Sequence, residues 1–504
     1  MDEKIRSSQV SNWLLILNIL VSFIYLGWWF DFSHIHNPVL YSLLLFGEIY
    51  HVTMACGFWF TVWNRKKKNK TPSTQKAYYP PIDVFITVAG EPVEIVKETI
   101  QAAKKIDYPD FQIYVLNDGY VAKKENWKDI DNLAENLGVN CITRKTPGGN
   151  KAGNINNALS ETTHEFVAIL DADMVPHKDF LKKLTPFFND PEIAFVQSPQ
   201  YYKNHEKNEI TKGAWEQQSF FFGPIMNQKN KVNAAFICGT NVLIRRAALN
   251  EVGGIDEKNI AEDFLTSLFI HKKGWKSHYV SEVLCEGLAP EDLLSYYKQQ
   301  HRWARGSLGV FFTHNPLFSR KLSFSARIQY LLSSIFYLNG VVVLIDITMP
   351  LLFLFFSMQP VNTSTSSFAL FFIPYILLNL YTIYIVSGES ITFRAISFTQ
   401  SSWTLQLAAL FSILTGKKTA FAVTSKKQQQ GNFIYLSYPH IFYCVLSIIG
   451  LLINIPKYTD PAVFANSAWT VFNMVMFLPF ILASFQTSPK PTIHYMPIRK
   501  LEHI

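Results

Sequence analysis

The sequence predicts an α/β domain inserted in a bundle of about six transmembrane α-helices, and three observations predict it. Hydrophobic residues make up 49% of the 504 residues, whereas charged residues make up 17%, below the roughly one quarter usual for soluble domains. The apolar residues gather in long runs toward both ends of the chain, as membrane spans do. Between these runs, short apolar stretches alternate with amphipathic ones, which is typical of an α/β fold with a mostly parallel sheet.

Six apolar runs are long enough to cross a hydrocarbon core of about 30 Å. They cover residues 13–30, 39–63, 328–356, 368–386, 433–455 and 468–485. The first run has no small-residue cleavage site, so we expect a retained anchor rather than a signal peptide. Loops 31–38 and 358–367 contain no Lys or Arg, whereas the stretches after the second run and after residue 416 are basic. The positive-inside rule then predicts a multi-pass plasma-membrane protein with both termini and the central domain in the cytosol.

These features divide the chain into four parts. We expect a transmembrane hairpin at 1–64, a cytosolic domain with interfacial helices at 65–325, four transmembrane helices at 326–486 and a cytosolic tail at 487–504. Residues 401–414 are apolar but too short to cross, so we expect an interfacial helix there. This helix leads into a polar loop at 416–432.

The net charge of +8 indicates a lipid bilayer as partner rather than a nucleic acid. The basic run that begins at Arg65 and the lysines between 417 and 427 lie beside spans, where they set topology or contact anionic lipids. The five cysteines have no metal-ligand spacing. Neither a disulfide framework nor a zinc site is therefore expected.

In the central domain, apolar runs predict strands and amphipathic stretches predict helices. The predicted strands are 82–88, 112–116, 139–143, 166–170 and 193–197, and the predicted helices are 93–104, 151–160 and 178–188. Ligands of such sheets bind at the carboxyl ends of the strands, and the acidic motifs of the sequence fall there.

Two acidic motifs directly follow predicted strands. Asp118 lies between Asn117 and Gly119, where a carboxylate can hold a ribose or a base edge; an ordinary Asp-Gly turn is the commoner explanation of such a triplet alone. Asp171 and Asp173 can share one hard cation, Mg²⁺ or Mn²⁺, which also holds a diphosphate. The alternative for this pair is a solvated acidic turn.

Two further motifs lie at predicted helix starts. Lys151 follows two glycines and begins a helix, so backbone amides and its ammonium can bind phosphate, although a flexible loop explains the glycines equally well. Glu262 and Asp263 are adjacent carboxylates: Asp263 can act as a general base with Glu262 as its orienting neighbour. They could also be no more than the acidic first turn of a helix.

The last motif joins Gln299 to an adjacent Arg302 and Trp303. The guanidinium can bind a diphosphate while the indole stacks on the C–H face of a sugar. The alternative is an amphipathic helix that lies on the membrane with basic residues toward lipid headgroups.

Taken in order, these motifs resemble the D, DxD, TED and QxxRW signature of processive family 2 glycosyltransferases, such as cellulose, chitin, curdlan, mixed-linkage glucan and hyaluronan synthases. Residues 151–159 look like the KAGNLNNAL segment of that family, and 236–240 look like its FCGS segment. Residues 421–426, Phe-Ala-Val-Thr-Ser-Lys, match the FxVTxK gating loop of cellulose synthases.

The resemblance implies a GT-A-type domain and an inverting, processive hexosyltransferase. It would transfer glucose from UDP-glucose to the non-reducing end of a growing glucan, with Mg²⁺ or Mn²⁺, and move the polymer through its own channel. Cellulose and mixed-linkage (1,3;1,4)-β-glucan are both candidate products. A chitin- or hyaluronan-like synthase that uses UDP-N-acetylglucosamine is the first alternative, and a non-processive lipid-phosphate glycosyltransferase is the second.

The resemblance also assigns roles to individual residues. Donor binding would fall to Glu91 and Asp118 at the uridine, Lys151 at the diphosphate, Asp171 and Asp173 at UDP and the metal, and Gln299 and Arg302 at donor and diphosphate. Cys238 and Trp303 would contact the acceptor sugar, and Asp263 with Glu262 would be catalytic. Phe421, Val423, Thr424 and Lys426 would close over the nucleotide.

The sequence departs from the family pattern at several places. Ala261 replaces the Thr of TED, Met174 stands where cellulose synthases commonly have His, and Ala89-Gly90-Glu91-Pro92 replaces the usual text around Glu91. We also expect no cyclic-di-GMP sensor after the last span. These departures favour a non-cellulosic or mixed-linkage glucan. Asp346, inside the third span, also suits a transporter with a nucleotide-sensing domain, because intramembrane carboxylates are usually functional.

Overall fold

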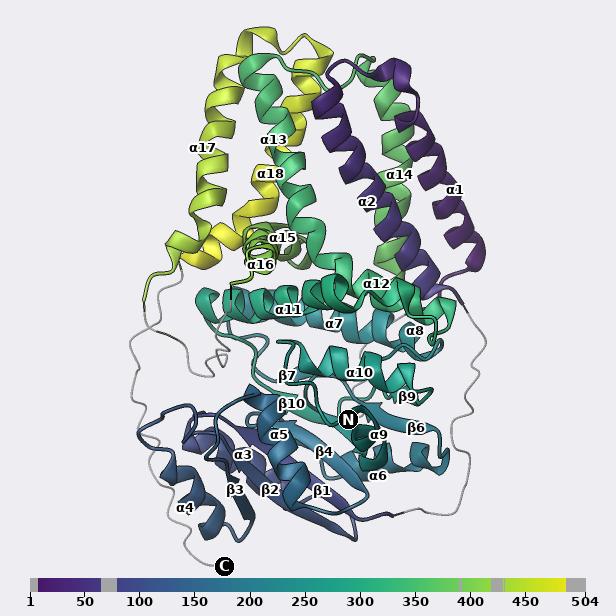
Figure 1. Cartoon of the computed structure of the whole chain (residues 1–504). Coiled ribbons are helices and arrows are strands. Elements are labelled where there is room, and N and C mark those ends of the chain that lie inside the picture. The colour runs from purple at the N-terminus through teal and green to yellow at the C-terminus, as the bar shows by residue number, and fades with distance from the viewer. Residues whose placement is uncertain (1–7, 65–78, 389–391, 418–428, 430, 486–504) are drawn as a thin grey trace, which may run out of the picture.

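The computed structural model describes residues 8–64, 79–388, 392–417, 429 and 431–485. Figure 1 shows three layers: an α/β domain, a layer of helices that lie across it, and a bundle of long helices beyond them. Segments from both ends of the chain meet in the long-helix bundle, whereas the α/β domain comes from the middle of the sequence.

The α/β domain is built on a seven-stranded sheet of order β3-β2-β1-β4-β8-β6-β9. Its strands are β1 (Ile82–Val88), β2 (Phe111–Asn117), β3 (Asn140–Thr143), β4 (Phe166–Asp171), β6 (Ile193–Gln197), β8 (Val242–Arg245) and β9 (Lys276–Tyr279). Every residue of β1 is buried, as expected for a central strand covered on both faces. The strand β8 runs antiparallel to both of its neighbours, whereas the other pairs are parallel, so the sheet is mixed but mostly parallel, as predicted.

Helices and a small second sheet complete this domain. The helices are α3 (Val93–Ala103), α4 (Lys128–Asn136), α5 (Asn150–Glu161), α6 (Phe180–Leu184), α9 (Arg246–Val252) and α10 (Glu262–Lys272). The second sheet joins β5 (Val175–Pro176), β10 (Cys285–Gly287) and β7 (Tyr201–Tyr202). The helix predicted at 178–188 was wrong in extent: it ends at Leu184 and continues as a 3-10 turn that contains Pro186. Proline cannot donate the backbone hydrogen bond that an α-helix interior needs.

A layer of helices lies across the α/β domain, between the sheet and the bundle (Figure 1). They are α7 (Glu209–Phe220), α8 (Met226–Asn230), α11 (Leu293–His314), α12 (Phe324–Ile335), α15 (Phe393–Ser401) and α16 (Trp403–Leu414). The interfacial helix predicted at 401–414 corresponds to α16, whereas α15 was not foreseen. Half-buried and exposed apolar side chains such as Phe393 and Phe411 suit these helices to an interface.

Within the described residues, six helical segments are long and apolar enough to cross a membrane, as predicted. They contain α1 (Asn12–Trp29), α2 (Pro38–Val62), α13 (Asn339–Phe356), α14 (Thr365–Val386), α17 (Tyr438–Ile453) and α18 (Pro461–Ser484). The third predicted span is not one straight helix, because a 3-10 turn at Phe336–Leu338 separates α12 from α13. In Figure 1, α12 lies along the middle layer and only α13 rises into the bundle. The chain is therefore a multi-pass membrane protein.

Candidate active site

The carboxyl edge of the sheet brings together most of the predicted site. Asp171 is the last residue of β4, and its amide donates a 2.8 Å hydrogen bond to Thr240 Oγ1. Lys151, in the first turn of α5, forms an ion pair with the Asp171 carboxylate and donates to the carbonyl of Gly239 at 2.8 Å. The segment 236–240 is thus attached to β4 at the point where the acidic motif begins.

Asp173 is held differently from Asp171. Its side chain is buried, and its Oδ2 accepts a 2.9 Å hydrogen bond from the amide of Leu288. A Cβ on Gly287 would lie 3.3 Å from the same oxygen, so a glycine lets the backbone approach this carboxylate. The neighbouring Met174 sulfur accepts a hydrogen bond from Asn241 at 3.6 Å. The residue that departs from the family pattern therefore packs beneath the acidic pair.

The side chain of Asp118 is held by an arginine that sequence reasoning missed. Arg144 donates from Nε and Nη2 to the two carboxylate oxygens at 2.8 and 2.7 Å, a bidentate pair. The same guanidinium donates to the carbonyls of Gly148 and Asn150, at the turn before α5. A Cβ on Gly153 would lie 2.5 Å from Arg144, which explains a glycine inside this helix. Asp118 and the Lys151 turn are therefore parts of one rigid unit.

Glu262 and Asp263 begin α10 and face Lys151. Asp263 Oδ1 accepts a 2.7 Å hydrogen bond from the amide of Phe264. A Cβ on Gly239, whose φ is +82°, would lie 3.1 Å from Asp263 Oδ2 and 3.7 Å from Lys151 Nζ, so these groups share one small space.

The electrostatics around Glu262, Asp263 and Lys151 favour proton exchange. Burial, and then the charge of Asp263, raises the pKa of Glu262 above its usual value. Burial likewise raises the pKa of Asp263, although the Phe264 amide and nearby cations oppose it. Burial lowers the pKa of Lys151, but the surrounding carboxylates raise it overall, so this lysine stays charged. A buried carboxylate with a raised pKa is suited to general base catalysis near neutral pH.

The helix α11 supplies the QxxRW residues. Gln299 is buried, whereas Arg302 and Trp303 are half-buried. Arg302 lies near enough to lower the pKa of both Glu262 and Asp263. At Gly306 this helix approaches the backbone before α10 so closely that a Cβ would lie 2.3 Å from the Cβ of Ala261.

Cys238, the expected acceptor neighbour, is half-buried between the sheet and the middle layer. Its amide donates to Gln197 Oε1 at 2.9 Å, and its carbonyl accepts from Gln200 at 2.7 Å. Burial raises the pKa of its thiol well above the usual range. The thiol is therefore neutral at physiological pH and unsuited to nucleophilic chemistry.

Two further parts of the predicted site are Glu91, which follows the carboxyl end of β1, and the gating residues. The Glu91 carboxylate accepts a 2.6 Å hydrogen bond from the amide of Ala89, within a turn in which Gly90 has φ +104°. Phe421, Val423, Thr424 and Lys426 lie outside the described residues, so their predicted role as a gating loop stays a prediction. Beside them, the Gln429 amide donates to Asp292, the N-cap of α11, at 3.0 Å.

The chemistry of the acidic pair fits a divalent cation whose remaining ligands come from substrate and water. Across the described residues there is no group of three or more His, Cys, Asp or Glu that could form a complete protein site. Two carboxylates are nevertheless a common protein contribution to a Mg²⁺ site that is completed by phosphate oxygens and water. Asp171 and Asp173, two residues apart at the end of β4, supply that number of hard oxygen ligands.

Comparisons with known proteins agree with this arrangement. The family described as glycosyltransferase-like family 2 matches residues 80–306, and the family described as cellulose synthase matches residues 249–458. These matches relate the chain to the family 2 glycosyltransferases and, among them, to the cellulose synthases. It is similar to the cellulose synthase catalytic subunit of Pseudomonas fluorescens, at 28% identity over 92% of this chain and 65% of the relative. It is also similar to cellulose synthase 1 catalytic subunit of Komagataeibacter xylinus, at 28% identity over 96% and 67%.

The chain thus spans about two thirds of the length of the curated relatives it matches. Among solved structures, it resembles a mannosyltransferase of Pyrobaculum calidifontis in complex with GDP-mannose and Mn²⁺. The TM-score is 0.52 at 16% identity, over 75% of this chain and 100% of that one. This likeness concerns the fold and confirms the predicted GT-A-like α/β domain. The predicted relation to bacterial cellulose synthases is confirmed as well.

Proposed function

We propose that this protein is a membrane-embedded processive β-glucan synthase that uses UDP-glucose, inverts the anomeric carbon and moves its product through its own helices. One observation carries the proposal: Lys151 is placed between the donor carboxylate Asp171 and the base candidate Asp263. Donor and acceptor chemistry therefore meet at one edge of the sheet.

In this proposal the reaction is a single displacement. Asp263 takes the proton from the acceptor hydroxyl, whose oxygen forms a bond to the anomeric carbon of the donor as the bond to the UDP oxygen breaks. Glu262 would orient Asp263, and the charge of Asp263 raises the pKa of this neighbouring carboxyl group. Because the attack comes from the side opposite UDP, the configuration inverts.

The other residues bind and orient the donor. Asp171 and Asp173 would hold a divalent cation, Mg²⁺ or Mn²⁺, which supplies positive charge to the leaving diphosphate. Lys151 and Arg302 add cationic charge on the protein side of that group, and Gln299 can hydrogen-bond to the donor from the same helix. Asp118, oriented by Arg144, and Glu91 would contact the uridine.

The acceptor would lie between Cys238 and Trp303. Indole faces stack well on the C–H faces of sugars, and Trp303 extends from the helix that also carries Arg302. The gating residues Phe421, Val423, Thr424 and Lys426 would then cover the bound nucleotide and exclude water. Their match to the cellulose synthase loop supports glucose as the transferred sugar.

The orientation and the product are also proposals. The basic stretches beside the spans support a cytosolic site with both termini in the cytosol of a plasma-membrane protein, divided into hairpin, catalytic domain, bundle and tail as the sequence predicts. Met174 and the altered segment around Glu91, which depart from the cellulose synthase pattern, favour a non-cellulosic or mixed-linkage (1,3;1,4)-β-glucan over cellulose.

The test is purified protein in detergent, supplied with UDP-glucose and Mg²⁺ or Mn²⁺. We expect UDP release together with a polymer that linkage-specific β-glucanases digest. Turnover of UDP-N-acetylglucosamine alone would replace the glucan with a chitin- or hyaluronan-like product. UDP release with only a lipid-linked monosaccharide would indicate a non-processive enzyme, and the absence of any UDP release would leave the transporter.

A further inference from the structure

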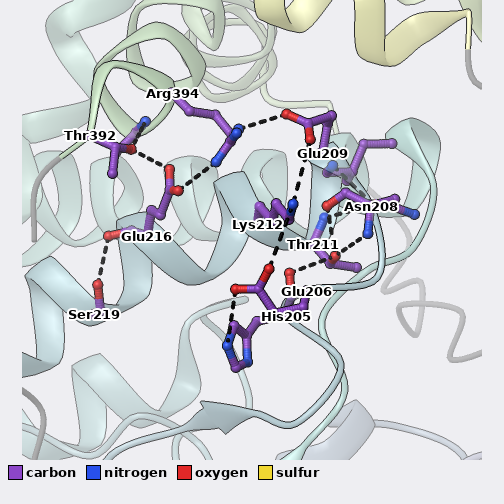
Figure 2. A network of polar contacts seen from close by, with 12 residues as sticks. His205, Glu206, Asn208, Glu209, Thr211, Lys212, Glu216, Ser219, Thr392 and Arg394 are labelled. Carbon is purple, nitrogen blue, oxygen red and sulfur yellow. Dashed lines mark hydrogen bonds and ion pairs between the residues drawn. The ribbon is translucent and has the colours of Figure 1, made fainter.

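A network of charged and polar side chains joins the catalytic domain to the helix α15, and no step of the proposed reaction uses it (Figure 2). Arg394, in the first turn of α15, donates from Nε to Glu209 Oε2 at 2.8 Å and from Nη1 to Glu216 Oε1 at 2.6 Å. Both glutamates belong to α7. One arginine of α15 therefore contacts two carboxylates nearly two turns apart on α7.

The contact is strengthened at both helix ends. The Thr392 hydroxyl donates to the second oxygen of Glu216, and it also accepts from the amide of Ala395 as the N-cap of α15. At the other end, Gln217 donates to Thr399 Oγ1 at 2.9 Å. The α7 helix itself begins with a capping box between Asn208 and Thr211, which fixes its first turn.

Packing beneath these polar contacts explains why the two helices lie so close. Phe398 of α15 is fully buried, and a Cβ on Gly213 of α7 would lie 3.0 Å from its ring. The edge of Tyr296, on α11, meets the same ring at a centroid distance of 5.5 Å. The Tyr296 hydroxyl in turn donates to Gln217 at 2.8 Å.

The other face of α15 holds a membrane helix. Ser397 donates to the carbonyl of Met476 at 2.5 Å, and Gln400 donates to Asn473 Oδ1 at 2.8 Å. Both partners lie on α18, one of the six candidate spans. The short helix α15 is therefore bonded on one side to the catalytic domain and on the other to the bundle.

The α7 helix reaches the acceptor region on its opposite side. Trp215 packs in the same apolar cluster as Cys238, and its ring meets the edge of Tyr201 at 4.7 Å. A continuous series of contacts thus runs from the Cys238 segment through α7 and α15 to α18. In the proposed function, the glycan moves from the acceptor position near Cys238 into the bundle that contains α18. The contacts through α7 and α15 set the distance between these two places.

We propose that Arg394 is a positioning residue that couples sugar transfer to chain elongation by holding α15 on α7, an inference that rests on the proposed function. Arg394 touches neither donor nor acceptor. Its loss leaves the chemistry of Asp263 intact but loosens the register between the acceptor position and α18. The growing chain then dissociates early instead of being extended.

The choice of arginine is part of this inference. A guanidinium offers several donors in a fixed plane, so one side chain can satisfy two carboxylates at once. A lysine at the same position keeps the charge but loses the fixed geometry. Glu216 is the more buried partner, at 16% side-chain exposure against 45% for Glu209, so its contact is the one that salt screens least.

The experiment uses the full-length chain in detergent or nanodiscs with UDP-glucose, and compares Arg394→Gln, Arg394→Lys and Glu209→Gln with the wild type. UDP release reports sugar transfer, and size-exclusion chromatography of the product reports chain length. Because hydrogen bonds between a guanidinium and a carboxylate are among the stronger side-chain interactions, and Arg394 makes one to each of two glutamates, we expect Arg394→Gln to shorten the product roughly fivefold or more while UDP release changes less than about twofold. Arg394→Lys should give an intermediate length, and Glu209→Gln should give the smallest change.

Lys182→Gln is the matched control, because Lys182 forms an exposed ion pair with Asp107 in the catalytic domain. It should leave both UDP release and product length unchanged. Hydrogen–deuterium exchange gives a readout independent of activity: exchange in Arg394→Gln should rise in α7 and α15 and not in the central sheet.

Three results would overturn the inference. They are an unchanged product length in Arg394→Gln, a loss of UDP release in proportion to product length, and unchanged exchange in α15. A failure of the proposed function would look different, because the wild type itself would then form no polymer from UDP-glucose.

Discussion

Two groups of carboxylates share the carboxyl edge of the same sheet, but their charges are handled in opposite ways. Asp118 is buried and accepts two hydrogen bonds from the Arg144 guanidinium, so its charge is compensated without a ligand. Glu262 and Asp263 are half-buried, and the Lys151 ammonium nearest to them is already paired with Asp171. Burial consequently raises the pKa of both carboxyl groups of this second pair.

The difference separates a scaffold from a reactive site. A carboxylate that is paired with a guanidinium keeps its geometry, which suits recognition of a nucleoside. An undercompensated pair holds its protons more tightly and can accept one from a substrate, which suits catalysis. The comparison therefore predicts that substitutions at Glu262 and Asp263 change turnover, whereas substitutions in the Asp118–Arg144 pair change stability.

Replacement of the base should have the largest effect on activity. In Asp263→Asn the amide cannot take a proton, so turnover should fall by about 10²–10⁴ while UDP still binds. Steady-state UDP release and calorimetric titration with UDP measure the two quantities. Glu262→Gln, which keeps the base, serves as the matched variant and should lose less. Near-normal turnover in Asp263→Asn would transfer the role of base to Glu262.

Removal of the compensating cation should mainly destabilise the protein. Arg144→Met leaves Asp118 as an unpaired buried charge, and breaking such a pair costs about 3–5 kcal/mol. The free energy of unfolding, measured by denaturant titration in detergent, should fall by that amount. The double variant Asp118→Asn with Arg144→Met should recover part of it, because no unpaired charge remains. If unfolding were unchanged in Arg144→Met, the claim that Asp118 is compensated by Arg144 would be wrong.

Asp118 and the pair of Glu262 and Asp263 also differ in how far the sequence could predict their surroundings. Each acidic motif follows a strand or begins a helix, and that position alone predicted the carboxyl edge. The pairing of Asp118 with Arg144 depends on strand register: Asn117 lies opposite Thr143 in the parallel pair of β2 and β3, so the next residues of both strands are neighbours. The composition of two strands that are separated by a helix does not show which of their residues will lie opposite each other.

The same limit applies to the fold. The strands β1 and β6 were predicted with correct bounds, because each is a short, fully buried run of mainly apolar residues. The strand β8, which makes the sheet mixed, has only four residues, and no local signal gives its direction. The turn at Phe336–Leu338 contains no proline or glycine, so α12 and α13 could not be separated by composition. Tertiary contacts of α12 in the middle layer decide where the span begins.

Loss of the diphosphate contact proposed for Lys426 should have a smaller effect than loss of the base. If Lys426 binds the diphosphate as proposed, Lys426→Ala should lower polymer synthesis about 10- to 100-fold, because a hydrogen bond to a charged group contributes about 1.5–3 kcal/mol. Lys427→Ala is the matched control, since a lysine that only sets topology can be replaced without harm. Equal activity of the two variants, measured in correctly inserted protein, would contradict a gating role for the loop.

The smallest predicted effect concerns the distance between α11 and the reactive pair. Gly306 lets α11 approach Ala261, and through this contact Arg302 stays close enough to lower the pKa of Glu262 and Asp263. In Gly306→Ala the new Cβ would lie 2.3 Å from the Ala261 Cβ, so the helix must move outward. Overpacking of this kind costs about 1–3 kcal/mol, which thermal unfolding would detect.

Turnover of Gly306→Ala should fall as well, because Arg302 moves away from the donor and from the two carboxylates. Gly309→Ala, one turn along the same helix, is the matched control: its nearest neighbour would be Asn259 Nδ2 at 3.4 Å, an ordinary contact. The double variant Gly306→Ala with Ala261→Gly removes the clash between the two Cβ atoms, although the backbone nitrogen of residue 261 would still lie 2.8 Å away. We therefore expect partial recovery of both stability and turnover. If Gly306→Ala and Gly309→Ala unfolded at the same temperature and turned over equally fast, the approach of α11 would not control the charge at the reactive pair.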